Sequence, residues 1–464
     1  MSRLLVISNR VGNPKAGASA GGLAVALGEA MRERGGVWFG WSGEIIDDAN
    51  TPATHREELG NIELVTTDLT RGEYENYYLG FSNQVLWPVF HYRVDLAQFE
   101  SANLKGYQRV NRRFAERVRE ILRPDDIVWV HDFHLIPLAS ELRAMGVANP
   151  IGFFLHIPFP PTQVLLTVPQ NAWLVRSMFS YDVVGFQTEV DRLHFRRYVT
   201  EEAKGRDIGD NMLVAYGRTL LARAFPIGMD AEPFRALAQS RQAEEQVDRQ
   251  RSRNLGRTNI IGVDRLDYTK GLPQRMRAFE RLLESYPENR GQVVFTQVAP
   301  PTRVDVDAYA DIRSELEGLS GAINGRFSDF DWTPIRYIHR AVARRTLAAL
   351  YATSGVGLVT PLRDGMNLVA KEYVVAQGND NPGVLVLSRF AGAAETMTEA
   401  LIVNPYDLDE VAEAMQLALR MPLDERQDRH RKLIGKVTMF DNRHWTRSFL
   451  EALRAAVGQS APTV

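Results

Sequence analysis

The fold of this chain is decided by Val356-Gly357-Leu358-Val359-Thr360-Pro361-Leu362, which runs directly into Arg363-Asp364-Gly365-Met366-Asn367-Leu368-Val369-Ala370-Lys371-Glu372. The pattern predicts a buried strand, a sharp turn at the glycine and the start of a helix. The first turn of such a helix offers unpaired N–H groups and the positive end of the dipole, where a diphosphate can bind. Asp364 and Glu372 add acceptors for sugar hydroxyls. Ligands of open α/β folds bind at such strand ends, so the stretch predicts a nucleotide-sugar site rather than packing alone.

The same alternation of short apolar runs and helical patterns extends through most of the chain. Strands are expected at residues 4–8, 37–41, 62–66, 127–131, 152–156, 183–187, 259–263, 292–297, 335–338, 356–360 and 384–387. Helices are expected at residues 22–34, 107–122, 190–202, 272–285, 304–316, 343–352, 367–377 and 408–419. This order predicts an α/β protein whose parallel sheets are covered by helices.

One polar segment interrupts the alternation. Residues 231–257 are rich in Gln and Arg and contain no apolar strand, so we interpret them as a hinge with a surface helix inside it. The chain then divides into an N-terminal doubly wound domain, 1–230, and a C-terminal one, 231–440. A last helix within 441–464 is expected to pack back on the N-terminal domain.

Composition narrows the class of protein. The chain has 464 residues, a formal net charge of −2 and no cysteine, which excludes disulfides, thiolate metal sites and cysteine nucleophiles. Near-neutral charge argues against a nucleic-acid partner, and the basic pairs Arg112-Arg113 and Arg344-Arg345 are expected on solvated helix faces. No run resembles a signal peptide or a membrane span, so we expect a cytoplasmic enzyme with no membrane partner.

The first strand leads into a glycine pair. Asn9-Arg10 follows residues 4–8, and Gly21-Gly22 then opens a helix, where adjacent glycines let a backbone approach a ligand closely. A tight turn is the alternative reading of this pair. The spacing is neither G-x-G-x-x-G nor a P-loop, which disfavours a Rossmann dehydrogenase and excludes a P-loop NTPase.

Two later strands end in polar residues. Asp132 follows the apolar run 127–130, where its carboxylate can orient a sugar hydroxyl or accept its proton. His156 ends the next strand and is either a site residue or a satisfied core histidine. A metal at His131 and His134 is disfavoured, because no third ligand lies nearby in the sequence.

A pair of cations follows the first strand of the second half. Arg265 and Lys270 flank a loop that opens a helix, and together they can clamp a diphosphate. A surface ion pair with Asp264 or Asp267 is the alternative. Arg303 ends the next strand and adds a further cation.

Together these motifs resemble the trehalose-6-phosphate synthases, retaining glucosyltransferases of glycosyltransferase family 20 with the GT-B fold. The likeness runs from Met1 to about Trp445. The blocks that carry it are Ser8-Asn9-Arg10, residues 19–24, Phe39-Gly40-Trp41-Ser42-Gly43, Leu86-Trp87-Pro88, His131-Asp132, residues 155–160, Asp264-Arg265-Leu266-Asp267-Tyr268 and residues 364–372.

The resemblance implies two domains that face a cleft, and it assigns roles to residues of both. Catalytic residues would be Asp132, His156, Arg265, Lys270 and Asp364. The acceptor would bind Arg10, Tyr78, Trp87, Asp132 and Arg303. The donor would bind Gly21, Gly22, His156, Arg265, Lys270, Val342, Asp364, Gly365, Met366, Asn367, Leu368, Val369 and Glu372.

The reaction that the resemblance implies is transfer of glucose from UDP-glucose to glucose 6-phosphate with retention, giving α,α-trehalose 6-phosphate for osmoprotection and the stress response. The acceptor attacks on the face that the diphosphate leaves, and the leaving phosphate takes the proton. Two cations and a helix dipole can neutralise the diphosphate, so we expect no metal and no other cofactor. A homo-oligomer, a dimer or tetramer, is also expected. The rivals are an acceptor such as glycerol 3-phosphate, another nucleotide, or an inactive regulatory homologue.

Overall fold

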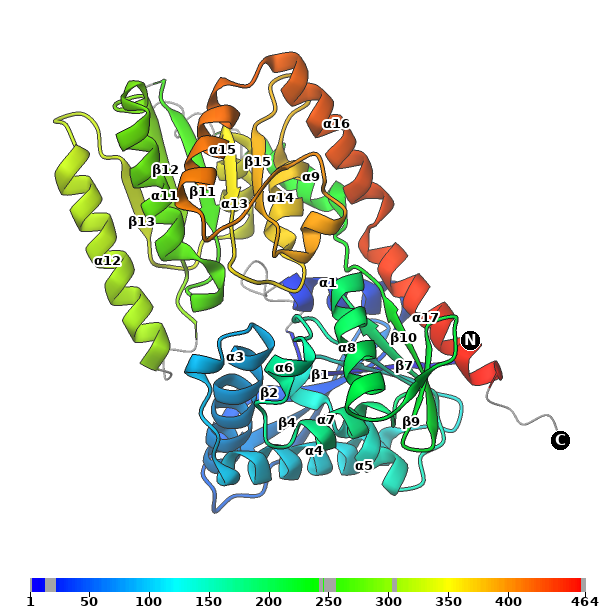
Figure 1. The fold of residues 1–464 in the computed structure, drawn as a ribbon. Helices are drawn as coiled ribbons and strands as arrows, with labels where there is room; N and C mark the ends of the chain where they lie inside the picture. Colours follow the sequence, from blue (N-terminus) through cyan, green and yellow to red (C-terminus); the bar gives the residue numbers. More distant parts are fainter. Residues whose placement is uncertain (1, 13–21, 242–244, 246–255, 303–306, 460–464) are drawn as a thin grey trace. The chain divides into compact units, whose positions relative to one another are not determined.

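The computed structural model describes residues 2–12, 22–241, 245, 256–302 and 307–459. These residues divide into two compact units (Figure 1). The N-terminal unit contains residues 2–12, 22–227 and 442–459, and the C-terminal unit contains the described residues between 228 and 441. The chain therefore passes between the units at Ile227–Gly228 and again at Asp441–Asn442.

The N-terminal unit is built on one mixed sheet with the strand order β3-β4-β2-β1-β5-β6-β7-β10-β9-β8. From β4 to β10 the neighbours pair in parallel, and antiparallel strands occur only at the two edges of this described sheet. The order reverses at β1, so the carboxyl ends of β1 and β5 lie at the switch point. The strands are β1 Leu4–Arg10, β2 Gly36–Ile46, β3 Thr54–Leu59, β4 Ile62–Thr70, β5 Ile127–His131, β6 Ile151–Phe154, β7 Val183–Phe186, β8 Arg206–Asp207, β9 Met212–Ala215 and β10 Arg218–Ala224.

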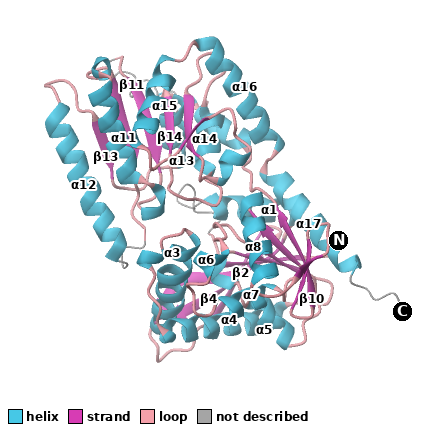
Figure 2. Ribbon diagram, in the orientation of Figure 1, coloured by secondary structure: helices cyan, strands magenta, loops and turns pink. Residues whose placement is uncertain are grey.

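Helices cover this sheet (Figure 2). The main ones are α1 Gly22–Arg34, α4 Ser101–Ile121, α5 Leu138–Ala144, α7 Asn171–Met178, α8 Glu189–Glu201 and α17 Asn442–Gln459. A π-helical segment, Tyr74–Leu86, packs along α4 and continues into α3, Trp87–Phe90. Long π-helical segments are rare and occur mostly at functional sites, which draws attention to Tyr78 within it.

The C-terminal unit has a six-stranded sheet whose neighbours all pair in parallel, in the order β13-β12-β11-β14-β15-β16. Here the order reverses between β11 and β14, which defines a second switch point. The strands are β11 Thr258–Val263, β12 Val293–Val298, β13 Ile335–Ile338, β14 Val356–Val359, β15 Val384–Ser388 and β16 Leu401–Val403. The helices are α9 Ala231–Ala238, α11 Leu272–Ser285, α12 Asp307–Phe327, α13 Arg344–Ala352, α14 Leu368–Ala376, α15 Leu408–Arg420 and α16 Leu423–Met439.

The last helix of the chain completes the core of the N-terminal unit. Trp445 and Phe449 of α17 are fully buried, and their rings lie 4.8 and 4.9 Å from the ring of Trp129 on β5. Phe449 fits against the sheet because Gly152 and Gly185 carry no side chain, since an added Cβ there would lie 2.6 and 2.9 Å from its ring. Residues more than 250 positions apart in the sequence therefore share one core.

The predicted α/β architecture with two doubly wound sheets is confirmed. The helix expected within residues 231–257 is α9, which exposes Glu232, Pro233 and Ala236 and packs its other face, with Phe234 fully buried, against α13 and α14. The average polarity of the segment conceals one apolar helix face. Residues 242–244 and 246–255 of the predicted hinge lie outside the described part of the chain.

The prediction that both basic pairs lie on solvated faces is wrong for one arginine of each pair, Arg113 and Arg344, which are half-buried. Arg113 donates to Glu73 at 2.8 and 3.0 Å and to the Thr67 hydroxyl at 2.9 Å. Arg344 lies 3.6 Å from Glu372 and over the ring of Phe234. A charge pattern alone cannot reveal a carboxylate that the fold brings from elsewhere.

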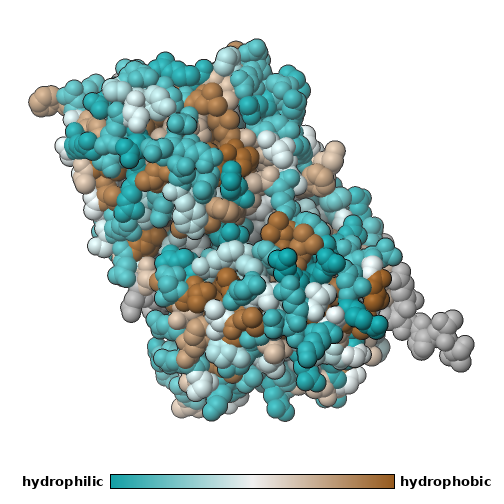
Figure 3. All heavy atoms as spheres, in the orientation of Figure 1, coloured by the Kyte–Doolittle hydropathy of each residue, from teal (hydrophilic) through white to brown (hydrophobic). Residues whose placement is uncertain are grey.

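On the face drawn in Figure 3, hydrophobic atoms form small separate patches within a largely hydrophilic surface. Among the described residues, no helix is both long enough and apolar enough to cross a membrane.

Candidate active site

Arg10 lies at the carboxyl end of β1, at the switch point of the N-terminal sheet. Its guanidinium carbon is 5.6 Å from the centre of the Trp41 ring. The side chain passes across Gly43, where φ is +97° and an added Cβ would lie 2.3 Å from Arg10 Nη2. Arg10 is exposed and forms no ion pair with any residue that the structure describes. A cation held in this way can receive an anionic group of a ligand.

Asp132 follows β5, the strand beside β1, and has an unusual backbone. Its φ of 76° and ψ of 165° fall in a region that is costly for any residue except glycine. Its Oδ1 accepts a hydrogen bond from the backbone N–H of His156 at 3.2 Å. The carboxylate of Asp132 thus lies at the carboxyl end of β5. Residues with a strained backbone of this kind cluster at functional sites.

His156 and His131 form a hydrogen-bonded pair behind Asp132. Nδ1 of His131 and Nε2 of His156 are 3.1 Å apart, and Gln187 Nε2 lies 3.4 Å from Nδ1 of His156. Gln187 Oε1 accepts from the Ile227 N–H at 3.0 Å, which fixes the amide so that its nitrogen donates to His156. His156 then carries its proton on Nε2 and donates it to His131.

Burial keeps both imidazoles neutral. Desolvation lowers the pKa of His156 to about 3 and, together with the neighbouring His156, lowers that of His131 well below its usual value. The ring of Trp445 lies 5.9 Å from that of His156. Both His156 ring nitrogens are engaged by protein groups, so the glucose contact that the resemblance implies would have to replace one of these bonds.

Tyr78 and Trp87, the predicted acceptor residues of the π-helical region, lie in an aromatic cluster. The Tyr78 ring stacks on His134 at 5.9 Å and on Tyr74 at 5.4 Å, and it remains half-buried. Trp87 is buried and lies 4.1 Å from the ring of His91. Rings held this firmly can form the wall of a sugar subsite at little cost in side-chain entropy.

The switch point of the C-terminal sheet brings Lys270 and Asp364 together. Lys270 follows β11 and Asp364 follows β14, and Nζ donates to Oδ2 at 2.5 Å. Their loops are also joined, because Leu362 N–H donates to Thr269 O at 2.8 Å. A buried cation thus lies beside a carboxylate at the edge where the sequence predicts the diphosphate and the transferred sugar.

Asn367 links this pair to the start of α14. It has φ 75° and ψ 85°, caps the helix by accepting from Ala370 N–H, and donates to Asp364 Oδ2 at 3.0 Å. Leu368 and Val369 are the first helical residues, so their N–H groups lie at the positive end of the dipole. Main-chain bonds from Asp364 and Met366 to residues 390–393 fix the loop that includes Gly365.

Glu372 and Val342, the predicted ribose and base contacts, are both half-buried. Glu372 lies on α14, where burial raises its pKa although Arg344 stands 3.6 Å away. Val342 lies in the loop between β13 and α13.

Arg265 extends from the loop after β11. It lies 3.5 Å from Asp267, which is the ion pair weighed as the alternative to a phosphate role. Its side chain is 40 % exposed. Arg303 and Gly21 lie outside the described residues, and Gly22 is the first residue of α1.

Arg275, which no motif of the sequence indicates, joins the strand ends of this switch point from within the core. The side chain is fully buried and donates to Asp264 at 2.9 Å, Gln297 at 3.1 Å and Thr360 at 3.2 Å. It also reaches the carbonyl of Lys270 at 3.3 Å. Burial raises the pKa of Asp264, and Arg275 and Lys270 oppose that rise. In the sequence Arg275 is one of several arginines in an amphipathic helix. The one signal of its role is its position on the apolar face of that helix.

No metal centre accompanies these groups in the described ranges, where no three His, Asp or Glu side chains are placed to hold an ion. The charges of the C-terminal site include Lys270, Arg265 and Arg275 and the carboxylates of Asp264, Asp267 and Asp364.

Comparison with known proteins decides the family. The model of "Glycosyltransferase family 20" matches residues 8–455. The chain belongs to glycosyltransferase family 20. This family 20 chain is 48 % identical to a trehalose-6-phosphate synthase of Sinorhizobium fredii over 459 residues, 98 % of this chain and 99 % of that protein.

Solved structures agree with this assignment. A UDP-forming α,α-trehalose-phosphate synthase from Burkholderia xenovorans, in complex with glucose-6-phosphate, matches with a TM-score of 0.95 and 51 % identity over 98 % of this chain and 100 % of that one. The Escherichia coli protein bound with UDP-2-fluoro glucose matches with a TM-score of 0.93 and 45 % identity over 98 % and 99 %. The glycosyltransferase therefore has the GT-B fold that the resemblance implies.

Proposed function

We propose that this chain transfers glucose from UDP-glucose to glucose 6-phosphate with retention, giving α,α-trehalose 6-phosphate and UDP. The observation that carries the proposal is the Lys270–Asp364 pair at the switch point, beside the first turn of α14. Family membership supports it, as do the ligands in the names of two matched structures, glucose-6-phosphate and UDP-2-fluoro glucose.

The donor end of the reaction needs charge neutralisation. As the glycosidic bond breaks, negative charge grows on the diphosphate, and Lys270, Arg265 and the N–H groups of Leu368 and Val369 can stabilise it. Asp364 shares its proton-accepting oxygens with Lys270 and Asn367, so a glucose hydroxyl can replace one of these donors. No protein nucleophile is required, because the acceptor hydroxyl itself attacks on the face that the diphosphate leaves. No protein base is required either, because the leaving phosphate accepts the proton of that hydroxyl.

The acceptor end needs a cation for the phosphate and oxygens for the sugar. Arg10 supplies the first and Asp132 the second, with Tyr78 and Trp87 as apolar walls. Arg303 remains a predicted second phosphate ligand. These fixed groups contribute by positioning, which can supply a large part of a rate enhancement.

UDP release tests the function. We expect release from UDP-glucose with glucose 6-phosphate and little with glycerol 3-phosphate or with glucose. Release with glycerol 3-phosphate alone would support the rival acceptor. No release with any acceptor, from a folded protein, would support an inactive regulatory homologue.

Metal independence is part of the proposal. Two cations and a helix dipole can balance the diphosphate without a divalent ion. Activity should therefore survive exhaustive chelation. A loss that added Mg²⁺ or Mn²⁺ restores, at a fixed concentration of free nucleotide, would contradict it.

Three further expectations remain proposals. The donor nucleotide is UDP rather than ADP or GDP, the enzyme works in the cytoplasm, and it forms a dimer or tetramer. A panel of nucleotide sugars tests the first, fractionation of cells tests the second, and light scattering at several protein concentrations tests the third.

A further inference from the structure

The N-terminal unit has a cavity of about 670 Å³ at the edge of the sheet opposite the candidate site. It is lined by Leu4 and Ile127, at the amino ends of β1 and β5, and by the end of α1 and one face of α17. Arg10 and Asp132 lie at or beyond the other ends of the same two strands. A cavity of this size falls in the range that holds small molecules, roughly 300–1,000 Å³.

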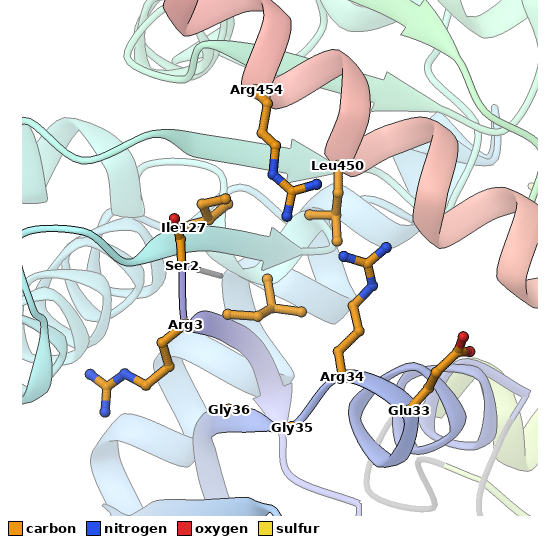
Figure 4. Close-up of a pocket in the computed structure, with 10 residues that line it drawn as sticks. Ser2, Arg3, Glu33, Arg34, Gly35, Gly36, Ile127, Leu450 and Arg454 are labelled. Carbon is orange, nitrogen blue, oxygen red and sulfur yellow. The ribbon is translucent and has the colours of Figure 1, made fainter.

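Two arginines converge on this cavity from different helices. Figure 4 shows Arg34 of α1 and Arg454 of α17 directed toward one another beside Leu450, whereas Arg3 and Glu33 point away. Burial and the charge of Arg454 lower the pKa of Arg34, while Glu33 and Glu451 raise it to a smaller extent. The two guanidinium groups therefore repel one another.

Two carboxylates of this region pair with other arginines, and Glu451 acts on Arg34 through its charge without a described ion pair to it. Glu33 lies 3.4 Å from Arg443, and Asp126 accepts two hydrogen bonds from Arg3, at 2.9 and 2.7 Å. Within the described part of the chain, neither Arg34 nor Arg454 forms an ion pair. Two like charges thus line one cavity, and neither forms an ion pair with a described carboxylate.

We propose that this cavity is a second anion site, which binds the phosphate group of a phosphorylated small molecule between Arg34 and Arg454. Guanidinium forks match phosphate oxygens in geometry and charge, and an anion between them would remove their repulsion. Leu4, Ile127 and Leu450 form an apolar wall for the organic part of the ligand. A phosphate ester should therefore bind more tightly than inorganic phosphate.

Calorimetric titration with phenyl phosphate and with inorganic phosphate tests the site. The pocket variant Arg34→Gln/Arg454→Gln is compared with the control Arg32→Gln/Arg447→Gln, which removes two exposed charges from the same helices outside the cavity. We expect the wild type and the control to bind phenyl phosphate at one site that the pocket variant lacks. Loss of these charge-assisted bonds should weaken binding about tenfold or more.

Steady-state kinetics tests whether the proposed anion site is distinct from the substrate sites. The KM values of the pocket variant for UDP-glucose and glucose 6-phosphate, measured in phosphate-free buffer, should equal those of the control. Equal loss of binding in both variants, or unchanged binding in the pocket variant, would overturn the proposal.

Hydrogen exchange gives a test that needs no variant. Phenyl phosphate should slow exchange of amides near Arg34 and in the turns of α17 around Leu450 and Arg454. Slowing confined to the regions of Arg10, Asp132 and Lys270 would show that the ligand uses only the substrate positions, and would also overturn the proposal.

Discussion

Lys270 shows how much one buried charge can contribute to this reaction. Its Nζ is largely buried and lies 2.5 Å from Asp364 Oδ2, at the edge of the sheet where the sequence predicts the diphosphate. We predict that Lys270→Ala lowers kcat by roughly a hundredfold, about 3 kcal/mol, because the cation matters most when charge develops in the transition state. Steady-state kinetics checks this, with the exposed Lys432→Ala as control. An effect confined to the KM for glucose 6-phosphate would mean that Lys270 binds the acceptor and not the diphosphate of the donor.

Arg275 acts on the same site through its neighbours. It is fully buried and joins Asp264, Gln297 and Thr360. We predict that Arg275→Met destabilises the protein by about 3–5 kcal/mol, since removing one partner leaves the charge of Asp264 buried and unpaired. Urea denaturation measures the loss.

The matched control for that variant is Arg277→Met. Arg277 lies on the same helix, is 41 % exposed and pairs with Glu315 on the surface. Exposed ion pairs contribute about 0–1 kcal/mol, so this change should be nearly silent. Equal effects of the two variants would mean that the buried network of Arg275 is not what stabilises the unit.

The sequence predicts some of these residues better than others. Lys270 and Asp364 can be predicted from the sequence, because a polar loop that follows an apolar strand lies at the ligand-binding edge of a parallel sheet. Their ion pair cannot be predicted from the sequence, because it depends on β11 and β14 being neighbours in the sheet. Arg275 is hidden for the same reason, since its partners come from three separate strands or strand ends.

At the scale of elements, β2 leaves room for the Arg10 side chain at Gly43. Gly43 has φ +97°, and a Cβ there would lie 2.3 Å from Arg10 Nη2. We predict that Gly43→Ala displaces the guanidinium and removes most of the preference for glucose 6-phosphate over glucose as acceptor. The ratio of the two kcat/KM values is the measurement.

Gly60→Ala is the matched control for Gly43→Ala. Gly60 also has a positive φ, +64°, but an added Cβ would meet nothing within 4 Å. It carries the same kind of backbone strain without touching Arg10. A similar loss of phosphate preference in both variants would attribute the effect to strain in the sheet rather than to Arg10.

The buried histidines at the ends of β5 and β6, His131 and His156, predict that the stability of the protein depends on pH. His156 has a folded-state pKa of about 3 and an ordinary unfolded value of about 6.5, so below pH 6.5 the unfolded chain binds more protons. Stability should therefore fall as pH decreases from 6.5 toward 3, by at most about 1.4 kcal/mol per pH unit for each histidine. His131 adds to the fall in the same direction.

Denaturation of the wild type and of His131→Asn/His156→Gln at pH 7 and pH 5 separates these histidines from all other groups. The variant should lose less stability between the two pH values. An equal loss in both proteins would mean that the pair is protonated in the folded state.

The elements themselves were largely predictable. Parallel strands covered on both faces are continuous apolar runs, and β1, β5, β11 and β14 were expected within a few residues of their observed bounds. The edge strands β3 and β8 are exposed, so they have no such signature. The π-helical segment follows from how Tyr74–Leu86 packs on α4, which no local pattern encodes.

At the scale of the whole molecule, α17 makes the N-terminal unit depend on the end of the chain. Phe449 is fully buried among Trp129, Phe154 and Phe225. We predict that Phe449→Ala destabilises the protein by about 3–5 kcal/mol, the usual cost of such a cavity. Denaturation followed by the fluorescence of the tryptophans near it measures this, with the exposed Leu417→Ala as control. A change below about 1 kcal/mol would mean that α17 is only loosely attached.

The position of α17 also sets the order in which the protein can be made. A ribosome completes the strands of the N-terminal unit first, yet the side chains that cover Trp129 and Phe154 are synthesised after the whole C-terminal unit. The N-terminal unit therefore cannot complete its core until residues 445 and 449 have been synthesised, although its strands come first in the chain.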